Sequence, residues 1–185
     1  MIERGINSPR TSSMGRLFDA AAAILGICGQ ATYEGEPAIE LEAAARRALD
    51  SEGAHFPDDN AGYSTSDPSR LDGPDVLDQK ALFEALLEGI EAGAPADRLA
   101  LDFHVAVARS SAHIASEICA REDIDTVALS GGVFMNRLLL QLLTRELKNA
   151  GLAVLVPHTV PVNDGCIAYG QAAVARARLA QIASQ

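Results

Sequence analysis

The sequence predicts an α/β protein whose residues 1–125 are mainly helical and whose residues 126–185 form a βαβα part. In the first part, apolar residues recur at helical spacing, which indicates amphipathic helices. In the second part, two short apolar runs flank one helical segment, which is typical of parallel strands joined by a crossover helix. With 185 residues, 48% of them hydrophobic, the chain is long enough to bury a core.

Two helices are expected near the start of the chain. Residues 11–13 can cap a helix whose apolar positions recur from Met14 to Leu25, and the glycines that follow end it. A second helix is expected to have Pro37 near its first turn and to run to about Leu49. Its acidic residues lie early and its arginines late, which matches the helix dipole.

The middle of the chain combines a loop with a helical pair. Residues 50–74 are rich in Asp, Ser, Gly and Pro, a composition that predicts a long surface loop. Two helices are expected to follow, over about residues 76–89 and 96–121. The longer one has its apolar residues on roughly one face, so we expect the two to pack together.

The last third predicts one βαβ unit and a final helix. The expected strands are residues 126–130 and 153–156, and the run from Asn136 to Asn149 between them is helical. The crossover should be right-handed and the strands parallel. A last helix, over about residues 165–182, is expected to cover the sheet.

Composition excludes several classes of protein. Twenty-five acidic residues outweigh fifteen basic ones, and the formal net charge of −10 opposes binding to nucleic-acid phosphates. We expect no membrane segment, because no apolar run is long enough to span a bilayer. We also expect no export signal, because the N-terminus has neither a basic region leading into an apolar one nor a small-residue cleavage site, so the cytoplasm is the expected compartment. The three cysteines are widely spaced and are expected to be reduced thiols, mostly in the core.

A glycine pair lies at the end of the first expected strand. The segment Ser130-Gly131-Gly132-Val133-Phe134-Met135-Asn136 also opens the following helix. Glycines there let a ligand approach the backbone, and helix N–H groups favour anions. The alternative is that the glycines only form a tight turn, and the spacing alone does not separate the two interpretations.

Acidic residues after the second strand and before the second helix allow similar alternatives. Asp164 is expected at the same sheet edge as the glycine turn, where it could bind a metal, although a helix cap is the commoner role. Gly35 precedes a helix, and Glu36 and Glu40 lie in its first turns, where a carboxylate could bind ribose hydroxyls. On spacing alone, placement that suits the helix dipole is the favoured interpretation there.

Four sequence blocks together resemble one family. They are residues 11–19 (TSSMGRLFD), 33–42 (YEGEPAIELE), 130–136 (SGGVFMN) and 163–165 (NDG). In this order they are similar to the C-terminal part of the HypF family, carbamoyltransferases of hydrogenase maturation. The resemblance implies part of an actin-like (ribonuclease H-like) lobe, in a module that encloses a nucleotide and a metal.

The resemblance also implies a reaction and its partners. HypF enzymes form carbamoyl adenylate from carbamoyl phosphate and ATP. They then transfer the carbamoyl group to the C-terminal cysteine of HypE, on the way to the cyanide ligands of nickel-iron hydrogenase. The implied cofactors are therefore ATP or carbamoyl adenylate and a divalent metal ion, and the implied partner is a HypE-like acceptor.

The matching blocks imply binding roles but no catalytic residue. The nucleotide loop matches Gly131, Gly132 and Asn136, and the ribose-side segment matches Gly35, Glu36 and Glu40. Asp164 matches the metal-binding aspartate, with Asn163 as the alternative cap. The weaker cofactor-binding candidates are Ser13, Gly15 and Asp19.

Departures from the family pattern predict an incomplete enzyme. The acylphosphatase-like region, the zinc-finger cysteines, the adenylate-forming domain and the first actin-like lobe are missing from the 185 residues. The isolated chain is therefore expected to be inactive and to bind metal poorly. An apolar patch left by the absent lobe would favour a homo-oligomer. Alternative functions are a nucleotide-binding regulatory or assembly module, and another transferase or kinase of the actin-like superfamily.

Overall fold

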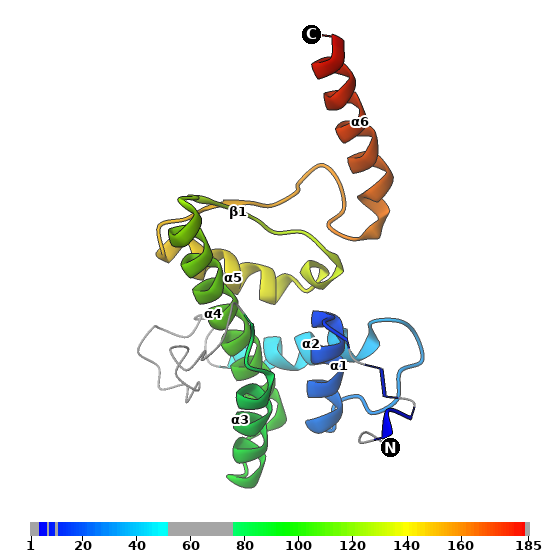
Figure 1. Ribbon diagram of the computed structural model, residues 1–185. Coiled ribbons are helices and arrows are strands. Elements are labelled where there is room, and N and C mark those ends of the chain that lie inside the picture. The colour runs from blue at the N-terminus through cyan, green and yellow to red at the C-terminus, as the bar shows by residue number, and fades with distance from the viewer. Residues whose placement is uncertain (1–3, 7, 10, 52–75, 184–185) are drawn as a thin grey trace. The chain divides into compact units, whose positions relative to one another are not determined.

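The computed structural model describes residues 4–6, 8–9, 11–51 and 76–183 (Figure 1). The surface loop expected over residues 50–74 lies almost wholly outside the described residues. The chain forms two compact units, Met1–Val107 and Ala108–Gln185, and the boundary falls within the long helix α4 (Ala96–Glu122). Each unit has its own core and is described separately.

The first two helices match the sequence-based expectation. Helix α1 spans Met14–Ile24, and helix α2 spans Glu36–Ser51. The two helices pack against each other. Several of the side chains that they bury are alanines, whose small size lets the helices approach closely. The buried residues are Leu17, Phe18, Ala21 and Ala22 of α1 with Leu41, Ala44, Ala45, Ala48 and Leu49 of α2.

Helix α3 (Gln79–Glu91) packs on the N-terminal half of α4, as expected. The Asp78 side chain caps α3 by accepting a hydrogen bond from the backbone N–H of Ala81, at 3.0 Å. A Cβ atom added at Gly89 would collide with the side chain of Leu99, so that side chain would have to shift for a larger residue to fit where the helices meet. The rings of Phe83 and Phe103 stack nearby, with centroids 6.5 Å apart.

A buried aromatic cluster lies in the core of the first unit. The Phe18 ring meets Phe103 and His104 edge-on, at centroid distances of 5.3 Å and 5.1 Å. Nδ1 of His104 donates a hydrogen bond to the carbonyl oxygen of Ala100, at 2.7 Å. Burial lowers the pKa of His104 to about 4, because desolvation penalises the charged ring. This histidine is therefore a neutral part of the core at neutral pH.

The second unit contains the predicted βαβ element. Strands β1 (Thr126–Ala128) and β2 (Ala153–Leu155) pair in parallel, with Val127 opposite Val154. Between them runs α5 (Arg137–Asn149), which packs on β2. The sheet face that carries Leu155 is open, since 59% of that side chain is exposed. The leucines that α5 buries are Leu138, Leu139, Leu142, Leu143 and Leu147.

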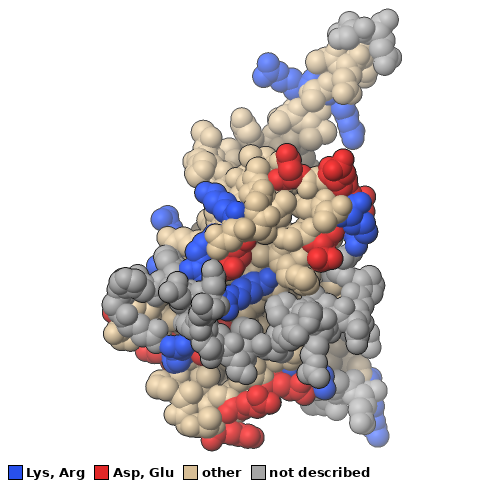
Figure 2. Space-filling model, turned by 90° about the vertical axis from the view of Figure 1, so that its left-hand side faces the viewer, with Lys and Arg blue, Asp and Glu red and all other residues tan. Residues whose placement is uncertain are grey.

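The expectation that the last helix covers this sheet is wrong. After a short 3₁₀ helix, η4 (Asp164–Cys166), helix α6 spans Ile167–Ala183, and its residues 167–182 are all exposed. Figure 2 shows its visible face as mainly uncharged, with Lys or Arg side chains on it. The apolar residues of α6 are spread around the helix and form no single stripe, so no one face is adapted to the sheet.

The three cysteines differ in exposure. Cys119 is buried, whereas Cys28 and Cys166 are half-exposed, so the expectation that the thiols lie mostly in the core holds for Cys119 alone. Within the described ranges, no helix is both long and apolar enough to cross a bilayer.

Candidate functional site

The turn between β1 and α5 has a backbone that requires glycine. Gly131 has a φ angle of +115°, a backbone conformation that residues other than glycine rarely adopt. The 3₁₀ helix η3 (Gly132–Met135) follows, and the N–H of Phe134 donates to the carbonyl of Gly131 at 3.0 Å. A Cβ atom added at Gly132 would meet no other atom within 4 Å, so the backbone is approachable from that side.

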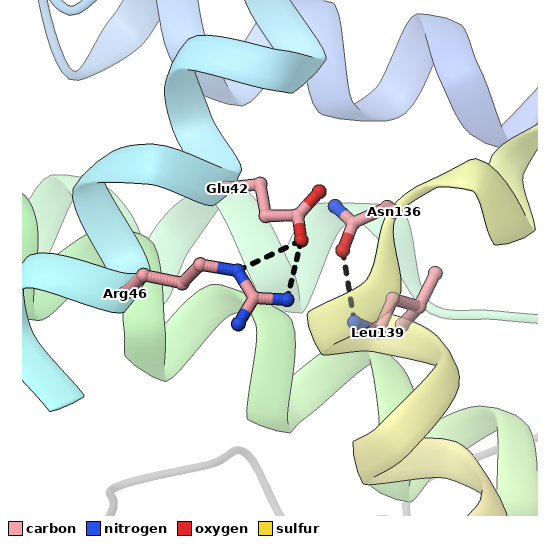
Figure 3. Close-up of polar contacts among 4 residues, drawn as sticks. All are labelled: Glu42, Arg46, Asn136 and Leu139. Atoms are coloured by element: carbon pink, nitrogen blue, oxygen red, sulfur yellow. Dashed lines mark hydrogen bonds and ion pairs between the residues drawn. The ribbon is translucent and has the colours of Figure 1, made fainter. Parts of the chain in front are cut away.

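Asn136 ends this turn and caps the helix that follows. Its Oδ1 accepts a hydrogen bond from the backbone N–H of Leu139 at 2.9 Å, and the residue is only 8% exposed (Figure 3). This is the usual geometry of an N-cap, which satisfies one of the unpaired N–H groups of the first turn. The structure thus gives Asn136 a definite role in starting α5, where the helix dipole favours anions.

The turn after β2 is capped by Asn163 and not by Asp164. The Oδ1 of Asn163 accepts a hydrogen bond from the N–H of Gly165 at 3.1 Å, and Asn163 occupies the N-cap position of η4. Asp164 is the first residue of η4 and is exposed. The helix-cap interpretation that the residues alone favoured for Asp164 is therefore wrong.

The two turns lie next to each other, as parallel strand ends predict. The N–H of Gly131 donates to the carbonyl of Val162 at 2.8 Å, which joins the first turn to the second. The side-chain amide of Asn163 also lies 3.7 Å from the sulfur of Met135. The spacing placed both turns at one edge but did not identify Val162, Asn163 or Met135 as the residues that connect them.

Three weaker candidates lie at helix α1 of the first unit. Ser13 occupies the N-cap position of α1, yet its hydroxyl makes no capping hydrogen bond to the helix. Its backbone N–H donates to the hydroxyl of Thr11 at 3.1 Å. Gly15 follows in the first turn, and the carboxylate of Asp19 pairs with Arg16 at 3.0 Å. An ion pair within the helix therefore already occupies Asp19.

The segment that precedes α2 carries three more candidates. Gly35 has φ of +84°, which favours glycine, and Glu36 is the first residue of α2. The backbone N–H of Thr32 donates a hydrogen bond to the Glu36 carboxylate, and this bond lowers the pKa of Glu36. Glu40 lies one turn further on and is exposed. The Glu36 carboxylate thus holds the loop that directly precedes α2.

Helix α2 also contains an ion pair that spans one turn. The guanidinium of Arg46 donates through Nε and Nη2 to one oxygen of Glu42, at 3.0 Å and 2.8 Å (Figure 3). The pair is only half-exposed, and it fixes the two side chains along the helix. The pair therefore stabilises helix α2.

The acidic side chains do not form a metal site by themselves. Among the residues that the structure describes, no three His, Cys, Asp or Glu side chains come close enough together to hold an ion. A divalent metal needs several ligands, so Asp164 alone does not fit a metal centre. Any ion bound there would need ligands from outside the described part of this chain.

Comparison with known proteins gives a consistent match. The family model for the second subdomain of the Kae1-like domain of carbamoyltransferases matches residues 1–171. The carbamoyltransferase HypF homolog of Cupriavidus necator is 40% identical over 178 residues, which are 95% of this chain and 43% of that protein. Carbamoyltransferase HypF of Rhizobium leguminosarum bv. viciae is 39% identical over 177 residues, 95% of this chain and 21% of that protein.

Solved structures agree with the sequence matches. A crystal structure of full-length HypF in its phosphate- and nucleotide-bound form has a TM-score of 0.77 and 30% identity. It matches 96% of this chain, which corresponds to 22% of that protein. The chain therefore spans less than half of the length of these relatives.

Proposed function

This chain belongs to the family of HypF carbamoyltransferases, as the second subdomain of their Kae1-like domain, and we propose that its two joined turns bind an adenine nucleotide. The ligand would be ATP or carbamoyl adenylate. The observation that carries this proposal is the turn at Gly131 and Gly132. A backbone hydrogen bond of 2.8 Å, from the N–H of Gly131 to the carbonyl oxygen of Val162, connects it to the turn between β2 and η4.

The geometry of the two turns suits a nucleotide. The backbone at Gly132 is open, and α5 begins directly after the turn, so its N-terminal dipole would favour a phosphate nearby. Asn136 holds the start of α5 through its cap bond and thereby fixes the turn. The HypF structure matched above contains phosphate and nucleotide, which supports the same ligand class here.

The roles of the remaining candidates are assigned from the hydrogen bonds and ion pairs that their side chains make. Glu36 is engaged with the Thr32 backbone, so Glu40 is the carboxylate that we assign to ribose hydroxyls. Asp164 would supply one ligand to a divalent metal, with the other ligands coming from the rest of the enzyme. Ser13, Gly15 and Asp19 of the first unit remain the weaker candidates for cofactor contacts, and the Asp19 carboxylate is already paired with Arg16.

The complete reaction requires more than this chain. The relatives are more than twice as long, and their additional parts would form carbamoyl adenylate and complete the pocket. In the transfer step, the C-terminal cysteine sulfur of a HypE-like acceptor would take the carbamoyl carbon, and AMP would leave. We place this reaction in the cytoplasm, in the maturation of a nickel-iron hydrogenase.

Calorimetric titration with ADP and magnesium tests the nucleotide assignment. The variant Gly132→Glu adds a carboxylate where the backbone is open, so it should block phosphate approach without strain in the fold. We expect its affinity to fall at least about tenfold, or about 1.4 kcal/mol. The matched control, Gly29→Glu, makes the same charge change at another open glycine and should bind like the wild type.

Two results would contradict the assignment. One is an unchanged affinity in Gly132→Glu, which would place the nucleotide elsewhere. The other is no detectable binding by the wild-type chain. Binding of ADP without carbamoyl transfer, after the rest of the enzyme has been supplied, would instead favour a regulatory or assembly module.

A further inference from the structure

Met135 presents an exposed apolar side chain at the glycine turn. The residue is 60% exposed and is the last residue of η3. A 3₁₀ helix has about three residues per turn, so side chains three positions apart lie above each other. Met135 therefore stands on the same side of η3 as Gly132, where an added Cβ atom would meet no atom within 4 Å. The open side of the turn is thus bordered by a flexible thioether.

The side-chain amide of Asn163 orients this thioether. Its Oδ1 accepts the hydrogen bond from the N–H of Gly165 at 3.1 Å, and this directs Nδ2 to donate to the sulfur of Met135 at 3.7 Å. A thioether sulfur is only a weak acceptor, so the contact contributes little to stability. Its main effect is to restrain a side chain that has three rotatable bonds.

The space around Gly165 keeps Asn163 in this position. A Cβ atom added at Gly165 would lie 3.1 Å from Oδ1 of Asn163 and 3.5 Å from Cγ of Pro161. A side chain at this position would therefore displace the Asn163 amide. Because Gly165 has none, Asn163 can cap η4 and reach Met135 at the same time.

A restrained methionine suits the flat face of a nucleotide base. Thioether sulfur is polarisable and makes favourable contacts with aromatic rings. The exposed apolar surface of Met135 would be covered more completely by a purine than by a smaller pyrimidine, which favours the larger ring. A side chain that is already restrained also loses less conformational freedom when the ligand binds.

We propose that Met135, held in position by Asn163, contacts the base of the nucleotide and makes the site prefer a purine. In this assignment Met135 touches the ligand, whereas Asn163 acts through Met135 as a positioning residue. The inference rests on the proposed function, because it takes the glycine turn as the nucleotide site. It adds selection of the base to a site that was assigned from its open backbone at Gly132.

Titrations with ADP and with UDP test the purine preference. The two ligands carry the same ribose and phosphates, so the ratio of their affinities reports on the base alone. We expect the wild-type chain to bind ADP more tightly, and Met135→Ala to reduce the ratio at least about fivefold. The control Ile124→Ala shortens a side chain that is 49% exposed and precedes the other end of β1, and it should keep the wild-type ratio. An unchanged ratio in Met135→Ala would overturn the proposal.

The variant Asn163→Asp separates orientation of Met135 from capping of η4. The aspartate keeps an oxygen for the N–H of Gly165 but has no amide to donate to the sulfur. Its charge acts on the same phosphates in both ligands and therefore cancels from the ratio. We expect the ratio to fall toward that of Met135→Ala. A wild-type ratio in Asn163→Asp would reduce Asn163 to a helix cap and overturn its positioning role.

Methyl NMR provides a readout that does not depend on affinity. The chain has three methionines, so Met135→Leu identifies the ε-methyl signal of Met135. We expect this signal to shift when ADP is added, through the ring current of the adenine, and its order parameter to be lower in Asn163→Asp. Shifts of the Gly131 and Gly132 amides without a shift of the methyl would overturn this inference and leave the nucleotide assignment intact. No shift at either place would overturn both.

Discussion

The two compact units differ in how completely they bury their own apolar surface. In the first unit, α1 to α3 and the start of α4 enclose an aromatic cluster, with Phe18 1% exposed and His104 fully buried. In the second unit, the sheet has two strands of three residues each, one open face and an exposed final helix. Parallel sheets are normally covered on both faces.

This difference suggests a division of roles. The first unit has the properties of a self-sufficient helical core, whose stability depends on its own packing. The second unit carries the glycine turn and leaves surface to be covered, so its order should depend more on ligand and partner. Mutations in the first unit should therefore change stability strongly, and those in the second should change it less.

The largest effect is expected for Phe18→Ala. This ring is 1% exposed and touches both Phe103 and His104, so its removal leaves a cavity in the first unit. We expect a loss of about 3–5 kcal/mol in the free energy of unfolding, measured by denaturant titration. The control Ile39→Ala, at a side chain that is 53% exposed, should change it by less than about 0.5 kcal/mol. A similar loss in both variants would contradict the self-sufficient core.

A pH-dependent loss in the free energy of unfolding is expected from His104. Its pKa is about 4 in the folded chain and near 6.5 in the unfolded chain, so the unfolded state binds the proton first as the pH falls. The stability of the first unit should be fully present above pH 6.5 and should decline by about 3 kcal/mol as the pH falls to 4. Denaturant titrations across this range, compared with His104→Leu, measure the contribution. An identical pH dependence in the variant would sink the prediction.

The smallest effect is expected for Asn136→Ala in the second unit. Loss of the cap bond to Leu139 should destabilise α5 by about 1 kcal/mol. Asn136→Asp retains a capping oxygen and should change the stability by only a few tenths of a kcal/mol. Hydrogen exchange of the first turn of α5 measures both. Equal protection in the alanine and aspartate variants would show that the cap does not hold this turn.

The helices of the first unit could be predicted from local signals. Apolar spacing and end signals located α1 and α2 to within one or two residues, because packing here follows the amphipathic stripes. The pairing of α3 with α4 was also correct, since each helix has one apolar face. In the second unit the βαβ order was correct, although the strands are shorter than expected.

The wrong predictions concern segments whose residues do not indicate which side faces the core or which residue forms the cap. The position of α6 could not be derived, because its apolar residues indicate no particular face. The cap at η4 was ambiguous because Asn163 and Asp164 are both good capping residues. The bond from Gly131 to Val162 depends on backbone geometry that no residue type encodes.

The most direct test of the nucleotide assignment is an NMR titration of the ¹⁵N-labelled chain with ADP and magnesium. The account predicts that the largest shifts fall on the backbone amides of Gly131, Gly132 and Gly165, the two turns joined at the end of the sheet. Shifts that fall mainly on amides of α3 and α4, with these glycines unchanged, would contradict it.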